Sequence, residues 1–206
     1  MGTEEIYKGQ YKNNKRHGIG IYYYDDGAIY SGEWNNNKRH GTGKYSYPNG
    51  DIYEGNWEKD MIHGFGIYYF SHGAIYTGEW IKNMMYGKGN YTFATGAHYE
   101  GTWKKDLMHG FGEYRFENGA VYRGFWEYDR MNGKGTFYTP HNSRYSGEWL
   151  HGKRHGKGSF HYANGNVFTG MWKNDKKNGY GILFNQNGSI IQKGKWQNNN
   201  FLSPKK

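Results

Sequence analysis

The sequence predicts an all-β fold, an elongated single-sheet meander of β-hairpins, and three observations support this prediction. An aromatic residue recurs every 23 residues: tyrosine at 7, 30, 53, 76, 99, 122 and 145, then Phe168. Counted from this residue, glycine fills positions 3, 12 and 14 of all eight repeats. Aromatic residues make up 20% of the 206 residues, while all hydrophobic residues together reach only 35%, which leaves too few aliphatic side chains for a thick two-layer core.

Each repeat contains two short strands. Positions 1, 3 and 5, mostly Tyr, Gly and Trp, share one face because side chains alternate along a strand. Positions 12, 14, 16 and 18 share a face in the second strand, as in Gly64, Gly66, Tyr68 and Phe70. Position 21, which is glycine in seven repeats and Asn142 in the other, marks a turn. Two strands and a turn per repeat predict hairpins in series.

The repeats follow one another without a linker, so we expect a single continuous domain. Residues 1–6 form an N-terminal tail or the end of a preceding repeat, residues 7–191 form eight repeats, and residues 192–206 form a partial ninth repeat and a C-terminal cap. The eight repeats start at 7, 30, 53, 76, 99, 122, 145 and 168. The first repeat lacks the atypical sequence that usually caps a solenoid, so we expect a piece of a longer array.

Tryptophan marks position 5, and we expect these residues to form the structural lattice of the fold. A glycine opposite an indole leaves a flat bed of backbone on which the ring lies. One hairpin cannot bury that ring alone, so the neighbouring hairpin must cover it. The eight tryptophans are Trp34, Trp57, Trp80, Trp103, Trp126, Trp149, Trp172 and Trp196.

The composition limits both the cellular setting and the chemistry. Cysteine is absent, no apolar run reaches about 18 residues, and the N-terminus lacks the apolar stretch of a signal peptide, which favours a cytoplasmic protein. The net charge of +9 favours acidic partners. No phosphate-binding loop, carboxylate pair or nucleophile–base set stands out from the repeats, so we expect neither an enzyme nor a bound cofactor.

Tyr-x-Gly-x-Trp followed by Gly-x-Gly at a 23-residue period resembles the MORN (membrane occupation and recognition nexus) repeat, over residues 7–196. The resemblance implies an elongated single-sheet β-meander. It also implies that catalysis, in the members that are enzymes, belongs to a separate domain. The Asn-rich loops make the chain similar to the cytoskeletal and cell-division scaffolds of apicomplexan parasites, which implies a location at the cytoskeleton or the membrane periphery.

Positions 9 and 10 vary between repeats, and we expect them to line one edge of the sheet. The apolar members are a candidate edge for partner proteins, unless they fold back over their own hairpins: Met61, Ile62, Met84, Met85, Leu107, Met108 and Met131. The basic members are candidates for binding phospholipid head groups: Lys15, Arg16, Lys38, Arg39, Lys153, Arg154, Lys176 and Lys177.

The C-terminal end is a candidate dimer contact. The last hairpin has no following repeat to cover Trp196, and Phe201 and Leu202 remain as an apolar tag. An exposed final strand pairs readily with another chain, so we expect a homodimer.

The histidines are expected to be structural. Repeat position 11 carries His17, His40, His63, His109 and His155, too far apart for neighbours to share a metal ion. A weak metal candidate is the group His141, His151, His155 and His161.

The sequence is consistent with two functions. The first is a non-enzymatic scaffold that binds proteins, including a second copy of itself. The alternative is direct binding of anionic phospholipid, of the PIP₂ type, through the basic loop residues. Nucleic-acid binding is not expected, because rings that are packed on glycine cannot stack on bases.

Overall fold

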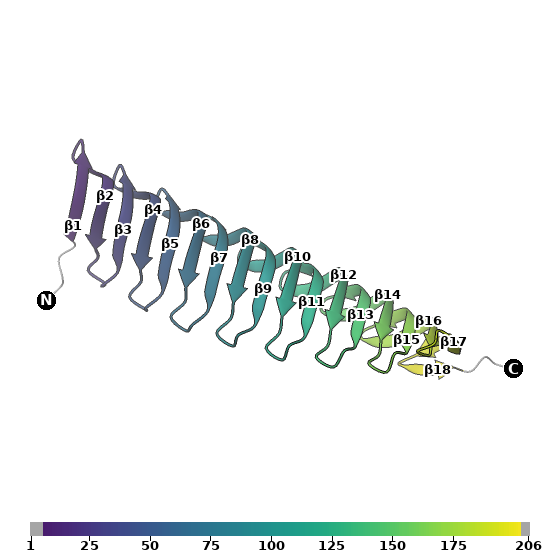
Figure 1. The fold of residues 1–206 in the computed structure, drawn as a ribbon. Helices are drawn as coiled ribbons and strands as arrows, with labels where there is room; N and C mark the ends of the chain where they lie inside the picture. The colour runs from purple at the N-terminus through teal and green to yellow at the C-terminus, as the bar shows by residue number, and fades with distance from the viewer. Residues whose placement is uncertain (1–5, 203–206) are drawn as a thin grey trace. The chain divides into compact units, whose positions relative to one another are not determined.

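The computed structural model of the protein describes residues 6–202, which fall into two compact units that divide between Leu107 and Met108. Among residues 6–202 there is no helix, and short turns join successive strands (Figure 1). The predicted all-β fold is therefore confirmed. Most of the predicted N-terminal tail, residues 1–5, and the end of the predicted cap, residues 203–206, lie outside the described residues.

The strands follow the repeat, two to each. The first unit contains β1 (Ile6–Lys12), β2 (Lys15–Tyr23), β3 (Ile29–Asn35), β4 (Lys38–Ser46), β5 (Ile52–Glu58), β6 (Met61–Tyr69), β7 (Ile75–Ile81), β8 (Met84–Thr92) and β9 (His98–Lys104). Next come β10 (Leu107–Arg115), β11 (Val121–Glu127), β12 (Arg130–Tyr138), β13 (Arg144–Leu150), β14 (Lys153–His161), β15 (Val167–Lys173), β16 (Lys176–Phe184), β17 (Ile190–Gln197) and β18 (Asn200–Leu202).

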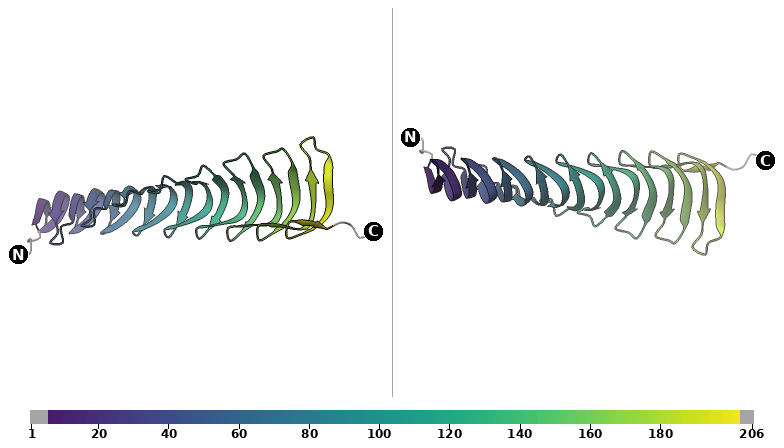
Figure 2. Two further views of the ribbon diagram at one scale, coloured as in Figure 1. Left: turned by 90° about the horizontal axis from the view of Figure 1, so that it is seen from below. Right: turned by 90° about the horizontal axis from the view of Figure 1, so that it is seen from above.

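Consecutive strands pair antiparallel within each unit, so each unit is an open meander of hairpins. Within each unit the strands are curved along their length, and the turns lie at the two ends of the strands (Figure 2). We call the side that carries Tyr30 and Trp34 the aromatic face, and the other side the opposite face. The buried side chains are nearly all on the aromatic face, chiefly the tyrosines of position 1 and the tryptophans of position 5.

The turn inside each hairpin has its two central residues in the left-handed region, as a type I′ turn requires. In the second repeat these are Asn36 and Asn37, with φ of 50° and 67°. The second turn residue also reaches back to the preceding repeat: Asn37 Oδ1 accepts a hydrogen bond from the Arg16 amide at 2.8 Å. Asp60 Oδ1 accepts one from the Arg39 amide at 2.9 Å. The Asn and Asp residues of these loops therefore link consecutive hairpins.

A β-bulge interrupts the pairing of seven hairpins: β1–β2, β3–β4, β5–β6, β7–β8, β11–β12, β13–β14 and β15–β16. Directly after Gly32 has paired with Gly43, Glu33 pairs with His40, so two residues of β4 have no partner in β3. One of them is Gly41, whose φ of 59° is in the left-handed region that favours glycine. The bulge therefore explains why position 12 is always glycine.

Candidate interaction surfaces

The aromatic face carries a ladder of alternating Tyr and Trp rings. The ring of Tyr30 lies 5.1 Å from that of Trp34 and 5.4 Å from that of Trp57, edge to face in both cases. Tyr30 is fully buried and Trp57 is 4% exposed. The indole Nε1 of Trp57 donates a hydrogen bond to the carbonyl of Gly43 at 3.2 Å. All eight tryptophans of the predicted lattice are buried: Trp34, Trp57, Trp80, Trp103, Trp126, Trp149, Trp172 and Trp196.

The glycines of the repeat accommodate two kinds of ring. Gly41 pairs with Trp57 across β4 and β5, so the indole faces a residue without a side chain, as predicted. Gly43 serves a different ring, because a Cβ at Gly43 would meet Tyr30 Cζ at 2.5 Å. Tyr30 lies across this bare backbone and donates a hydrogen bond from its hydroxyl to the Glu33 carbonyl at 2.9 Å. Burial raises the pKa of Tyr30 above its ordinary value, so the hydroxyl stays protonated and keeps donating.

Position 10 covers the tryptophan of the following repeat. The Arg39 guanidinium carbon lies 4.4 Å from the Trp57 ring centre, and its Nη2 donates a hydrogen bond to the Asp60 carbonyl at 2.9 Å. Arg154 lies in the same way over Trp172, at 4.6 Å. These arginines are half-buried, whereas the neighbouring lysines of position 9 are exposed. Of the predicted phospholipid-binding residues, Lys15, Lys38, Lys153 and Lys176 are therefore exposed, while Arg16, Arg39, Arg154 and Lys177 lie over aromatic rings.

Replacing Arg39 tests this covering role. We expect Arg39→Ala to lower the free energy of unfolding by about 1–2 kcal/mol, because it uncovers an indole and removes a cation–π contact and hydrogen bonds. Arg39→Met should restore at least about half of that loss, since Met85 occupies the same repeat position in β8. Urea unfolding followed by tryptophan fluorescence measures both. Equal losses for the two variants would contradict the covering role.

The predicted partner edge is not an open apolar surface. Ile62 is 3% exposed, and the other members are half-buried: Met61, Met84, Met85, Leu107, Met108 and Met131. Ile62 stands at the position where Arg39 covers an indole, which fits the alternative that these side chains fold back over their own sheet. Their role as a partner edge stays a prediction.

The C-terminal strand closes over the last tryptophan. Phe201 in β18 pairs with Trp196 in β17, with ring centres 5.3 Å apart. Lys177 lies over the same indole at 4.4 Å, and Trp196 is only 5% exposed. The expectation that Trp196 would remain uncovered is therefore wrong, because Phe201 takes the place of a covering repeat. Leu202 is exposed, and the homodimer itself stays a prediction.

The histidine group does not form a metal site in the part of the chain that the structure describes. His141 and His151 are exposed, and His155 and His161 are half-buried. Residues 6–202 contain no group of three or more His, Cys, Asp or Glu side chains that could hold a metal ion. Burial, helped by the nearby charge of Arg144, lowers the pKa of His161, so this imidazole is neutral at pH 7.

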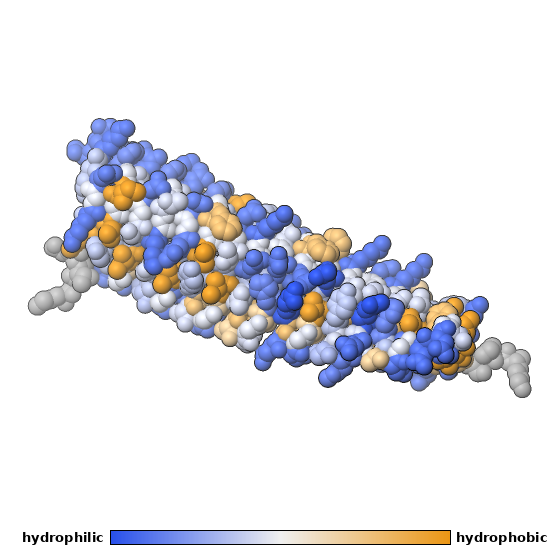
Figure 3. Space-filling model, in the orientation of Figure 1, coloured by the Kyte–Doolittle hydropathy of each residue, from blue (hydrophilic) through white to orange (hydrophobic). Residues whose placement is uncertain are grey.

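The opposite face carries exposed apolar side chains that the sequence analysis overlooked. Phe65 is 56% exposed, Phe111 53%, Phe125 50% and Tyr180 54%. Phe125 stands at position 4, which is polar in six of the eight repeats, and Phe65, Phe111 and Tyr180 stand at position 13. On the face of the molecule that Figure 3 shows, hydrophobic and hydrophilic residues are interspersed. The signal was present in the alternation of each strand, because position 13 points away from Trp and yet is apolar in four repeats.

The family model of the MORN repeat matches this chain eight times, at residues 7–29, 30–52, 53–74, 76–98, 99–121, 122–143, 145–167 and 168–190. The chain therefore belongs to the MORN-repeat family, which confirms the resemblance found in the sequence. No curated protein matches the chain significantly.

Two solved structures similar to this chain are domains of SAS-4 (dCPAP) and of CPAP. The TCP domain of Drosophila melanogaster SAS-4 (dCPAP), in complex with a proline-rich motif of Ana2 (dSTIL), is 16% identical, with 91% of this chain and 88% of that chain covered and a TM-score of 0.42. The TCP10 domain of Danio rerio CPAP is 10% identical, with 93% and 95% covered and a TM-score of 0.45. Among residues 6–202, no helix has the length and apolarity needed to cross a membrane.

Proposed function

We propose that this chain is a non-enzymatic scaffold that binds proteins, including a second copy of itself, at the cytoskeleton or the membrane periphery. The observation that supports the proposal is that one face of the sheet is used for packing, while the other face exposes side chains that vary between repeats. The repeated residues, Tyr, Gly and Trp, are used in packing on the aromatic face. The residues that vary from repeat to repeat leave Phe65, Phe111 and Tyr180 more than half exposed on the opposite face. Exposed apolar side chains of this kind often mark protein contacts.

Self-association is tested by light scattering on the purified chain. We expect a mass of twice 24.1 kDa at micromolar concentration. If the measured mass stays that of a single subunit at concentrations up to about 100 µM, self-association is removed from the proposal, because a stable dimer has a dissociation constant below that concentration.

Binding of other proteins is tested with variants of the opposite face. Partners recovered with the wild-type chain from cells should bind it again when purified, and should be lost with Phe65→Lys or Phe111→Lys. Trp fluorescence should show that both variants remain folded, because these side chains are exposed. Retention of every partner by both variants would remove the opposite face as the binding surface.

Phospholipid binding is the second candidate, supported by the exposed lysines Lys15, Lys38, Lys153 and Lys176. Co-sedimentation with vesicles containing PIP₂, at low and at physiological salt, separates it from the scaffold function. Under the scaffold proposal, binding is weak and disappears at physiological salt, since exposed charges are screened. Binding that survives physiological salt and is lost when the four lysines are changed to Gln would favour the phospholipid function.

A further inference from the structure

The bulge contains the backbone N–H of position 13, which in the first four repeats lies beside the side chain at position 4. In the first four repeats an oxygen of this side chain accepts the hydrogen bond: Gln10 from the Ile19 amide at 3.0 Å, Glu33 from Thr42 at 2.8 Å, Asn56 from Phe65 at 3.1 Å and Glu79 from Lys88 at 3.0 Å. We call this donor the bulge amide. The bond from Thr42 lowers the pKa of Glu33, as expected for a carboxylate held by an N–H donor.

Repeats 6 and 8 lack the acceptor. Phe125 and Met171 occupy position 4 there, and neither side chain has an oxygen. Within residues 6–202, the bulge amides of Lys134 and Tyr180 form no hydrogen bond to a side chain, although the bulge itself is present in both hairpins. These two amides are donors without the acceptor that the first four repeats supply.

The space beside the Lys134 amide is open. In repeat 2 the carboxylate of Glu33 lies directly against Gly41. In repeat 6 a Cβ at the equivalent Gly133 would find only Phe125 carbons, at 3.5 and 3.9 Å. The phenyl ring is turned outward and is 50% exposed. The volume that a carboxylate fills in one repeat is therefore free in the other.

The surroundings of this amide favour an anion beside an apolar group. A shallow hollow of about 600 Å³ on the opposite face is lined by Phe111, Phe125, Lys134, Glu148 and Lys157, among others. Lys134 and Lys157 form no ion pair within residues 6–202. The one basic residue in the lining that is paired is Arg123, which bonds to Glu113 at 2.6 Å. Glu148 lies against Gly156 of its own repeat.

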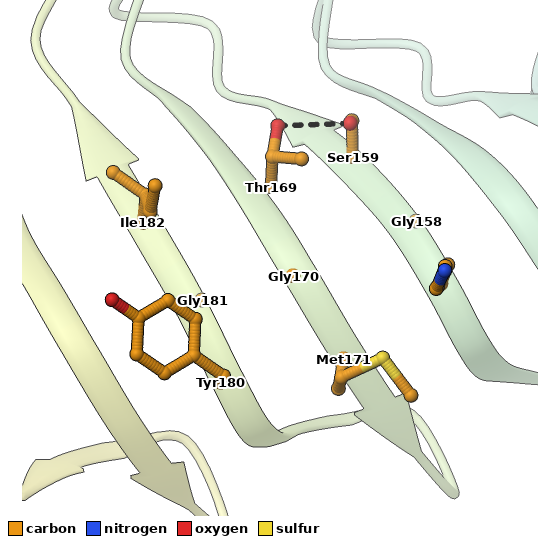
Figure 4. Close-up of a pocket in the computed structure, with 9 residues that line it drawn as sticks. Gly158, Ser159, Thr169, Gly170, Met171, Tyr180, Gly181 and Ile182 are labelled. Carbon is orange, nitrogen blue, oxygen red and sulfur yellow. Dashed lines mark hydrogen bonds between the residues drawn. The ribbon is translucent and has the colours of Figure 1, made fainter.

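A second hollow, of about 480 Å³, lies at the Tyr180 amide and is lined by Lys157, Met171 and Tyr180 over Gly170 and Gly181. Figure 4 shows Met171 and Tyr180 on neighbouring strands, beside the glycines that form its floor. Lys195 in β17 pairs with Tyr180, so its positive charge is on the same face as the Tyr180 side chain. This hollow repeats the chemistry of the first, with an unmatched amide, lysine and an apolar wall.

We propose that the opposite face of β11–β16 binds an acidic, partly apolar segment of a partner protein, whose carboxylates accept hydrogen bonds from the bulge amides of Lys134 and Tyr180. The proposal rests on the scaffold function and specifies the surface and the chemistry of its partner. A carboxylate is the ligand because Glu33 and Glu79 already fill the same site in other repeats. Apolar side chains two positions away from the acidic residues point to the same side of an extended segment, and these pack against Phe125 and Met171.

The geometry also sets the spacing of the two carboxylates. Lys134 in β12 and Tyr180 in β16 are four strand spacings apart, about 19 Å. An extended segment that crosses the strands advances about 3.3 Å per residue, so its two acidic residues lie about six positions apart.

The test is a titration of the ¹⁵N-labelled full chain with the peptide acetyl-Leu-Ser-Glu-Ser-Gly-Ser-Leu-Ser-Glu-amide, in which both Glu and both Leu side chains point to one side, followed by NMR and by fluorescence anisotropy of a labelled copy. We expect the Lys134 and Tyr180 amide resonances to shift most. Phe125→Glu should weaken binding by about tenfold, because the new carboxylate takes the Lys134 amide as Glu33 takes that of Thr42. This variant should melt no lower than the wild type, so that lost binding is not lost folding.

Two controls separate the site from general charge. Asn90→Glu adds the same charge on the opposite face in β8 and should change affinity by less than about twofold. The peptide with Gln in place of both Glu residues should bind at least about tenfold more weakly. Equal binding of the acidic peptide to wild type and Phe125→Glu, or no shift at Lys134, would overturn the proposal. So would inorganic phosphate shifting the same amides while the peptide does not. If Phe125→Glu still recovers every partner from cells, the scaffold function stands and this surface is not its site.

Discussion

Trp57→Ala is expected to lower the free energy of unfolding by about 3–5 kcal/mol, the usual cost of deleting a large buried aromatic side chain. Trp57 is 4% exposed, lies edge to face with Tyr30 and Tyr53, and donates a hydrogen bond to Gly43. Its removal therefore deletes ring contacts both within its own repeat and with the preceding repeat. Urea unfolding followed by circular dichroism measures the loss.

Phe65→Ala is the matched control for that experiment. Phe65 is in the next strand, β6, and is also aromatic, but it is 56% exposed on the opposite face. We expect it to change the free energy of unfolding by less than about 1 kcal/mol. Similar losses for both variants would show that stability does not depend on the aromatic ladder. Because repeat arrays can unfold in parts, the two variants should be compared with more than one probe.

Gly32→Ala is expected to lower the free energy of unfolding by about 3 kcal/mol or more. A Cβ at Gly32 would meet the Cα of Gly43, the carbonyl of Thr42 and, at 2.7 Å, the hydroxyl of Tyr30. Two of these three atoms are backbone, so relief requires β3 and β4 to move apart. Thermal unfolding by calorimetry should show the loss as a lower melting temperature.

Gly194→Ala provides the control at the same repeat position. The ninth repeat begins with Gln192 instead of a tyrosine, and a Cβ at Gly194 would find Phe201 Cε2 at 3.1 Å as its nearest neighbour. This side chain can move by a few tenths of an ångström, so we expect a loss of less than about 1 kcal/mol. If Gly194→Ala proves as costly as Gly32→Ala, the cause is backbone entropy and not the crowding around Tyr30.

Much of the fold could be predicted because it is encoded in short-range patterns. The 23-residue period, the alternation of Tyr, Gly and Trp, and the turn glycines each follow from the geometry of one or two strands. The pairing of Gly41 with Trp57 was likewise predictable, since a bare backbone is what a flat ring needs opposite it.

The contacts between repeats could not be predicted in this way. Nothing in the alternation of a strand indicates that Arg39 covers Trp57, or that Asp60 accepts a hydrogen bond from the Arg39 amide, 21 residues away in the chain. The bulge was also missed. The glycine of position 12 recurs in every repeat, but its period does not show whether it serves a left-handed backbone, as at Gly41, or a flat bed for a ring, and the hydrogen bond from Thr42 to Glu33 cannot be read from the sequence.

The opposite face was misjudged for a different reason. The repeat pattern suggests that the aromatic residues as a class serve packing, and this does not separate the exposed Phe125 and Tyr180 from the buried rings. Assigning each ring to a face by its repeat position would have separated them. The sequence alone does not indicate that Phe125 and Met171 lack an acceptor, because the acceptor role of position 4 follows only from the hydrogen bonds of the bulge amide in other repeats.

The joint between repeats has a direction. The side chain of Arg39, or its equivalent, lies over the indole of the following repeat. In return, the side-chain oxygen of Asp60, or its equivalent, in that following repeat accepts a hydrogen bond from the Arg39 amide. Two identical ends that meet across a twofold axis cannot form these contacts, because both ends would carry the covering side chain and the amide donor, or both would carry the indole and the oxygen acceptor. Copies joined through such a joint would instead add head to tail into an open filament. A closed pair must use a surface that the repeat does not use on itself.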